Sequence, residues 1–365
     1  MAVAARRCLL AGALWVVSAT VAAQAADEPA WHPYAQARAW AAYDAIAIAD
    51  LDGDWAGGVQ PRGGRNVMLQ RHRAEAGVER GAWRIGWEYR QEATLITDRQ
   101  TLGFVRRYKQ RIKPLETNSY ALAARLERWS AQGLRLGRWF GDADGLLPRV
   151  RISGAVYTRA SLRDTALDGS VLYRPVDQYE VDLRRSEADT SARYPFMREQ
   201  PGGAGVSMAL ALAWRLAPAL TANIDIDDLW SVMRYTGLPF KEERLDTKVS
   251  ALDADGYINY RPLLSGVNRQ ATVNRKLGRS GNAGLTYDSG ALLLGANVER
   301  LAGVTIPSLS LGRRFGWGVL STRVESRFRT VGIGIDTDHL NVALQTDTLR
   351  LHKAKALGLT MAVRF

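Results

Sequence analysis

The stretch "ALGLTMAVRF" (Ala356–Phe365) alternates apolar residues with small or polar ones up to the last position. Its apolar members are Leu357, Leu359, Met361, Val363 and Phe365. A period of two is typical of a β-strand, because successive side chains leave opposite faces of the pleat. The sequence therefore predicts a final strand with one apolar face that reaches the last residue.

The same period recurs along the chain between Gly and Pro clusters. In "AWRIGWEYRQE" (82–92), Trp83, Ile85, Trp87 and Tyr89 share one face, and Arg84, Glu88, Arg90 and Glu92 share the other. A soluble β-sandwich would bury the apolar face, whereas a membrane barrel turns it toward lipid and surrounds water with the charges. Alternation alone does not separate these two architectures.

Aromatic residues and turn lengths favour the barrel. Tryptophans lie toward segment ends, as interfacial girdles require, and tight turns alternate with long loops. We expect an all-β, transmembrane antiparallel β-barrel of 16–18 strands with both termini on the periplasmic side. The expected tight turns are 80–82, 130–132 and 217–218, and the expected long loops are 97–118, 186–205 and 231–244.

The C-terminal stretch resembles the C-terminal signature of Gram-negative outer-membrane β-barrels, the porin-like class, in which alternating apolar residues lead to a terminal Phe. This resemblance implies a barrel-closing strand that the barrel-assembly machinery recognises. A closed barrel has no free edge when its last strand pairs with its first. The expected partners are therefore this machinery, outer-membrane lipid and lipopolysaccharide; no specific family is identified.

The N-terminus has the pattern of a cleaved signal peptide. Arg6 and Arg7 precede the apolar run "CLLAGALWVVSATVAA" (8–23), and "AQA" (23–25) fits a cleavage site. We expect a signal peptide at 1–25, an N-terminal periplasmic segment at 26–38 and the barrel at 39–365. The single cysteine, Cys8, falls in the signal peptide. The expected location is the outer membrane.

Pairing segment 66–79 with 83–95 makes one hairpin explicit. This register sets Val78 opposite Ile85 on the lipid face and Glu79 opposite Arg84 on the inner face. A slipped register would place Arg in lipid, at a cost of about 2–4 kcal/mol each at the midplane. The expected charged lining of a water-filled or plugged lumen is Arg71, Arg73, Glu75, Arg84, Glu88, Arg90, Arg215, Arg323, Glu325 and Arg327.

The loop at 97–118 is basic. It carries Arg106, Arg107, Lys109 and Arg111, and one interpretation is a constriction folded into the lumen that favours anions. The alternative is a surface loop that binds lipopolysaccharide phosphates or is simply solvated. The sequence leaves both open.

Other motifs are weak. "DLDGDW" (50–55) resembles a calcium loop, but Trp55 and Pro61 occupy the positions where Gly and Glu are required. "DTDH" (336–339) groups carboxylates with an imidazole, in an expected periplasmic turn. No hydrolase elbow, zinc motif or phosphate loop appears. We expect no metal and no cofactor, and nothing points to an enzyme.

The net charge is +12, and +10 without Arg6 and Arg7. Pores that attract cations are usually acidic inside, so the expected Arg-rich lumen favours anionic cargo. Nucleic acid is not an expected partner of an exported barrel. The leading hypothesis is a passive outer-membrane channel favouring anionic solutes or an acidic polysaccharide. The alternatives are a non-conducting structural, assembly or surface-polymer-contacting barrel and an outer-membrane hydrolase.

Overall fold

The structure is a computed structural model. It describes residues 30–142, 147–175, 178–195, 197–247, 250–252, 258–260 and 263–365. The expected signal peptide at 1–25 and the first residues of the segment 26–38 lie outside the described residues.

Strands dominate the described part of the chain. They are β1 (His32–Tyr43), β2 (Arg65–Arg80), β3 (Trp83–Asp98), β4 (Asn118–Phe140), β5 (Arg149–Arg174), β6 (Gln178–Asp189), β7 (Gly202–Ala217), β8 (Leu220–Asp246), β9 (Ser250–Leu252), β10 (Ile258–Tyr260), β11 (Leu264–Arg275), β12 (Ser280–Asp288), β13 (Leu292–Leu301), β14 (Val304–Phe315), β15 (Gly318–Glu325), β16 (Thr330–Asp336), β17 (Leu340–Thr346) and β18 (Ala356–Arg364). Within the described residues, one α-helix, α2 (Arg99–Lys109), and two 3₁₀ turns, η1 (Ile48–Asp50) and η2 (Leu351–Lys353), join the strands. Among the described helices, none is long and apolar enough to span a membrane.

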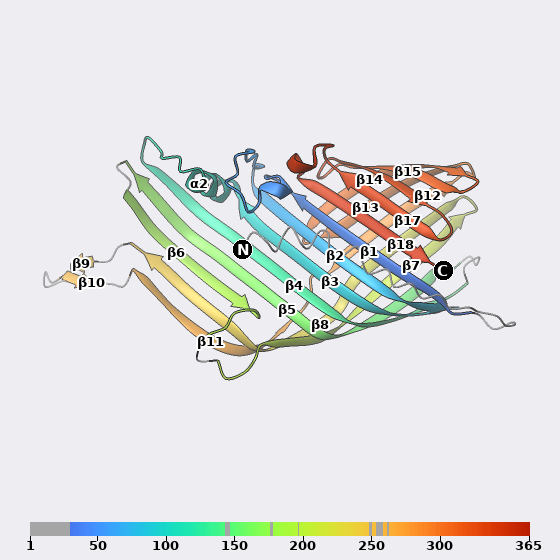
Figure 1. The fold of residues 1–365 in the computed structure, drawn as a ribbon, viewed down its shortest axis with the longest axis horizontal. Helices are drawn as coiled ribbons and strands as arrows, with labels where there is room; N and C mark the ends of the chain where they lie inside the picture. Colours follow the sequence, from blue (N-terminus) through green and yellow to red (C-terminus); the bar gives the residue numbers. More distant parts are fainter. Residues whose placement is uncertain are drawn as a thin grey trace.

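The sheet is antiparallel and closes on itself (Figure 1). β18 pairs with β1 from Tyr34 opposite Arg364 to Ala42 opposite Ala356. β9 and β10 form a separate small hairpin. The predicted all-β antiparallel barrel and its closing strand are confirmed.

The strand number is lower than expected. Sixteen strands form the sheet, but β6 and β7 share one place between β5 and β8, and β11 and β12 share one place beside β8. The barrel is therefore 14-stranded. Counting each alternating segment as a full crossing overestimated the number, because two crossings are each made of two segments.

The predicted hairpin register is confirmed. Val78 lies opposite Ile85 and Glu79 opposite Arg84, as the cost of placing Arg in lipid requires. Several boundaries differ from expectation, and the largest differences are in β1, β4 and β8. β1 begins at His32 rather than at 39, β4 continues through the expected turn at 130–132, and β8 contains the expected loop 231–244.

These boundary differences have local causes. "SAQ" (130–132) contains no residue that stops a strand, and the irregularity there is a bulge between Gln132 and Gly133. In β8, Gly237 takes a φ of +57°, a conformation that glycine adopts easily. The strand therefore continues through Pro239, with a register shift in its pairing with β11.

The outer face is apolar and the inner face is charged. Outward side chains that remain exposed include Ile85, Trp87, Leu134, Leu136, Val156, Trp214, Ile224, Leu309, Leu311, Ile333, Leu359 and Met361. Inward positions of the same strands hold buried Glu75, Glu88 and Arg90. An apolar belt of this extent on a closed barrel is the surface that a lipid bilayer covers.

The two ends of the barrel differ, and we call them the terminus end and the loop end. The terminus end holds β1's first residues, β18's last residues and short turns such as 81–82. The loop end holds α2, whose N-cap Asp98 accepts a 2.7 Å hydrogen bond from the Thr101 backbone N–H. Leu102 of α2 packs with Trp55 and Ile46 of the 44–64 segment, forming a cap at this end (Figure 1).

Candidate functional site

A bulge in β8 turns two neighbouring carboxylates into the barrel. The pairing of β8 with β7 shifts between Met208 and Leu210, and Asp228 takes a φ of +54°. The extra residue breaks the alternation that would send neighbours to opposite faces. Asp227 and Asp228 therefore both contact residues on the opposite wall.

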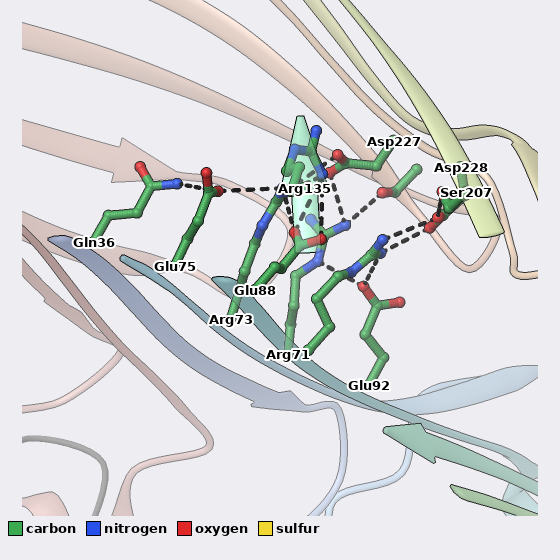
Figure 2. A network of polar contacts seen from close by, with 12 residues as sticks. Gln36, Arg71, Arg73, Glu75, Glu88, Glu92, Arg135, Ser207, Asp227 and Asp228 are labelled. Carbon is green, nitrogen blue, oxygen red and sulfur yellow. Dashed lines mark hydrogen bonds and ion pairs between the residues drawn. The ribbon is translucent and has the colours of Figure 1, made fainter. Parts of the chain in front are cut away.

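Asp228 binds the Arg90 guanidinium with both oxygens. Arg90 Nη1 donates to Oδ1 at 2.9 Å and Nη2 to Oδ2 at 2.7 Å. The Ser207 hydroxyl also donates to Asp228 Oδ1, at 2.6 Å, and Figure 2 shows these two residues side by side. Arg90 is 2 % and Asp228 1 % exposed. Bidentate, charge-assisted pairing of this kind is among the stronger polar contacts in proteins.

Asp227 is held by two arginines of β2. Arg73 Nη1 donates to its two oxygens at 3.2 and 3.3 Å, and Arg71 Nη2 approaches at 3.5 Å. Arg71 also donates to Glu92 at 3.1 Å and to Glu299 of β13 at 3.2 Å. One side chain thus contacts carboxylates of three strands.

Glu88 completes this set of contacts. It is fully buried, lies 2.6 Å from Arg73 Nη2, and accepts from Arg135 Nη1 at 3.2 Å and from the Tyr157 hydroxyl at 3.0 Å. We call the set the ion-pair layer: Arg71, Arg73, Glu88, Arg90, Glu92, Arg135, Asp227, Asp228 and Glu299. The layer joins β2, β3 and β4 to β8 and β13, so it crosses the lumen.

Apolar clusters cover the ion-pair layer on its loop-end side. One contains Trp129, Leu162, Met233, Tyr235 and Leu238, and Trp129 stacks 4.9 Å from the Arg90 guanidinium. The other contains Trp40, Val67, Leu69, Ile306 and Phe328. Along each strand these residues lie nearer the loop end than the charges do. The loop-end half of the interior is therefore packed.

The terminus-end side is hollow. A cavity of 280 Å³, here called the chamber, is lined by seven arginines and four carboxylates: Arg38, Arg71, Arg73, Arg84, Arg135, Arg151 and Arg323, with Glu75, Asp225, Asp227 and Glu299. A second cavity of 460 Å³ shares Arg38 and Arg323 with it and reaches Asp336 and Asn341 at the terminus end. We call this second cavity the smooth groove, because its inner wall includes Gly295, Ser310, Gly312, Ser321, Gly334, Gly358 and Thr360.

Hydrogen-bond donors are in excess in the chamber wall. Among the described residues, Arg73 Nε, Arg84 Nη2 and Arg151 Nε are buried there without a partner, against the single acceptor Asn297 Oδ1. A buried guanidinium N–H without a partner is costly. The chamber therefore suits a ligand rich in hydrogen-bond acceptors.

The expected lining residues divide into two groups. The structure places Arg71, Arg73, Glu75, Arg84 and Arg323 in the chamber wall, with Glu88 and Arg90 in the ion-pair layer. The remaining three, Arg215, Glu325 and Arg327, do not line the chamber.

Each of these three serves a turn or an end of the barrel. Arg215 is exposed beside the β7–β8 turn, where its Nη2 lies 3.5 Å from the Pro218 carbonyl. Buried Glu325 accepts a 3.0 Å bond from the Phe328 backbone N–H, and Arg327 binds Asp44 at 2.8 Å. Glu325 and Arg327 thus stabilise the loop end and do not line the chamber.

The expected constriction residues lie at the loop end as well. Arg106, Arg107 and Arg111 are exposed, and Lys109 Nζ donates to the Gly53 carbonyl at 2.7 Å and lies 5.0 Å from the Trp55 ring. None of the four lines the chamber. Arg106, Arg107 and Lys109 belong to α2, which packs against the 44–64 segment at the loop end and does not enter the hollow half.

Several members of the site were missed by the sequence analysis: Arg135, Arg151, Asp225, Asp227, Asp228 and Glu299. A signal for two of them exists. In "IDIDDLW" (224–230) the doubled Asp interrupts the alternation, as a bulge would. Glu299 contacts Arg71 and Arg38 of distant strands, which alternation does not identify.

No family model and no curated protein matches this chain. Among solved structures, the chain is similar to the deltaS2S3 mutant of the monoaromatic hydrocarbon channel TodX, at 10 % identity and TM-score 0.46, covering 93 % of this chain and 90 % of that one. It is also similar to the toluene transporter TbuX of Ralstonia pickettii (7 %, 0.31, 91 % and 88 %) and to the outer-membrane protease OmpT of Escherichia coli (7 %, 0.23, 92 % and 95 %). These similarities are too weak to assign a family, a cargo or a reaction.

The barrel itself has the architecture of the outer-membrane β-barrel class that the C-terminal stretch resembles. Apolar residues face outward, charged residues face inward, and the last strand pairs with the first.

Proposed function

We propose that this protein is an outer-membrane channel for small anionic solutes, closed at rest by the ion-pair layer. One observation carries the proposal. The donor-rich chamber borders a layer of side-chain ion pairs that joins opposite walls, and the smooth groove, which shares Arg38 and Arg323 with the chamber, reaches the terminus end. The terminus end faces the periplasm in this proposal.

The ion-pair layer is suited to rearrangement because its members have more than one partner. Arg71 contacts Glu92, Asp227 and Glu299, and Arg73 contacts Glu88 and Asp227. An arginine that exchanges one carboxylate for another avoids the full cost of an unpaired buried charge. Movement of β8's bulge, where Asp227 and Asp228 lie, would release contacts to both β2 and β3.

An anion fits the chamber better than a cation or a polymer. The unpaired atoms of its wall are mainly guanidinium donors, and Arg151 has no ion pair among the described residues. A volume of 280 Å³ holds a small solute and is at the lower end of known ligand pockets, which run from about 300 to 1,000 Å³. We therefore retain anionic solutes as cargo and leave out an acidic polysaccharide.

The location and partners belong to the same proposal. The apolar belt and the C-terminal strand support an outer-membrane location, reached through barrel-assembly machinery that recognises Leu357–Phe365. Exposed Arg106 and Arg107 at the loop end suit contact with lipopolysaccharide phosphates.

Planar-bilayer recording of the wild type and of Asp227→Asn tests the channel. We expect a mostly closed wild type, a higher open probability in Asp227→Asn, and a reversal potential in a salt gradient that shows anion preference. Asp288→Asn is the matched control, since Asp288 pairs with Arg314 at an exposed turn. Cation preference, or silence of both the wild type and Asp227→Asn, would contradict the proposal.

A second candidate is a non-conducting structural barrel, which the packed loop-end half favours. It predicts no solute flux in liposome-swelling assays from either the wild type or Asp227→Asn. Flux of small anions through Asp227→Asn alone would support the closed channel instead.

A further inference from the structure

The inner wall is bare at one point of the chamber. Gly137 of β4 lies opposite Arg84 of β3 on one side and Ser153 of β5 on the other. A Cβ at Gly137 would lie 2.8 Å from Ser153 Oγ and 3.6 Å from Arg151 Cδ. The side chains of both neighbouring strands thus border the space that Gly137 leaves open.

Three guanidinium groups belong to this part of the wall. Arg84, Arg135 and Arg151 all line the chamber, and Arg84 and Arg135 both repel the charge on Arg151. Like charges held together in a poorly hydrated wall are unfavourable unless an anion neutralises them. Contacts hold the three groups in place: Arg84 binds Glu75, Arg135 binds Glu88, and Arg151 lies over the Trp139 ring.

The hydrogen bonds of this trio leave donors unused. Arg84 donates to Glu75 at 3.0 Å and Glu79 at 2.9 Å, yet its Nη2 has no partner. Arg151 stacks 4.9 Å from the Trp139 ring, its buried Nε has no partner, and among the described residues it forms no ion pair.

The carboxylates that face the trio are mostly occupied. Glu75 and Glu79 bind Arg84, and Glu88 binds Arg73 and Arg135. Asp225 of β8 attracts Arg151 but forms no ion pair with it. The spare donors of Arg84 and Arg151 are therefore available to a ligand.

We propose that Arg84, Arg135 and Arg151 form a binding site for a small oxyanion, a phosphate or a carboxylate, over the bare backbone of Gly137. Guanidinium groups match both anions in shape and donor spacing. The site faces the lumen, so its ligand is a free solute instead of a lipid headgroup. The inference rests on the proposed function for the role of that solute as cargo; binding itself does not require conduction.

Calorimetric titration of the full-length protein in detergent, at low salt, tests the site with inorganic phosphate and, in parallel, acetate. We expect saturable binding of at least one anion. Arg151→Gln should weaken it by at least about tenfold, as loss of a charged hydrogen-bonding partner does. Gly137→Ala should weaken it too, by filling the space beside Ser153.

Arg149→Gln is the matched control. Arg149 lies two positions away on β5, stacks 4.7 Å from the same Trp139 ring and carries the same charge, but it does not line the chamber. It should change binding less than twofold. Equal weakening by Arg149→Gln and Arg151→Gln, or no binding of either anion by the wild type, would overturn the site.

The outcomes separate the site from the channel. Saturable binding that Arg151→Gln weakens establishes the site even when bilayer recordings show no current. Anion-selective current without such binding would keep the channel and remove the site.

Discussion

The two halves of the inner wall differ in what their side chains reach. On β2, β3, β4 and β8 long charged residues point inward and meet across the lumen in the ion-pair layer. On β13–β18 the inner wall of the smooth groove includes small residues such as Gly295, Ser310 and Gly358, which leave the groove open. The charged half therefore closes the lumen, and the other half leaves the lumen open. Both halves present an apolar surface to the outside.

Because the two halves differ, the same kind of substitution should have different effects on stability and on conductance in each. A change in the charged half removes contacts that join opposite walls. A change among the small residues of the smooth groove alters the free cross-section, because these residues take no part in the ion-pair layer.

The largest effect should follow removal of Arg90. Arg90→Ala leaves buried Asp228 without its bidentate partner, so we expect a loss of about 3–5 kcal/mol in the free energy of unfolding. Urea titration of the folded barrel in lipid measures it. Arg314→Ala, which breaks an exposed pair with Asp288, should cost about 0–1 kcal/mol.

A double variant sharpens the same test. Arg90→Ala combined with Asp228→Ala leaves no unpaired charge and should recover part of the lost stability. If the double variant is no more stable than Arg90→Ala, the cost does not come from an uncompensated Asp228.

The next effect concerns the shared outer face. Leu309 of β14 is 67 % exposed near the middle of its strand, so Leu309→Arg should destabilise the lipid-inserted barrel by about 2–4 kcal/mol. The same measurement on Ile85→Arg, in the charged half, should give a similar loss. A large difference between the two losses of stability would show that the two halves differ in their lipid-facing surface as well as in their inner wall.

A smaller change is expected in the smooth groove. Thr360→Trp on β18 adds bulk to its inner wall and should lower the single-channel conductance of the Asp227→Asn background severalfold, with little loss of stability. Met361→Trp, one position along and facing lipid, is the control and should leave conductance unchanged. Equal conductance in the two would exclude the groove as the path.

The smallest effect belongs to α2. Replacing Arg106 and Arg107 together by Gln should leave the reversal potential unchanged, because both are exposed at the loop end, away from the chamber. A shift toward cations in bilayer recordings would restore these residues as a constriction.

Local features of the fold were predictable from the sequence. The β2–β3 register and the outward apolar face of Leu357–Phe365 follow from alternation. A slip of one residue would exchange the apolar and charged faces of a strand. The strand number did not follow, because a bulge at Gln132–Gly133 and the split crossing of β6 and β7 look like turns or separate strands.

The candidate site was predictable in part. Arg71, Arg73 and Arg84 could be assigned to the interior from their own strands. Their partners Asp227 and Glu299 could not, because contacts across the lumen depend on how the strands close and tilt. The gap between Arg71 and Glu299 is 228 positions, beyond the reach of any local pattern.

The pairing of β1 with β18 has a consequence for biogenesis. His32 Nδ1 lies 3.2 Å from the carbonyl oxygen of Phe365, 333 positions away in the chain. Contacts so distant in sequence form slowly, and until this one forms both edge strands offer unpaired backbone groups to any neighbouring chain. The growing polypeptide must therefore be kept from aggregating until β18 has been delivered.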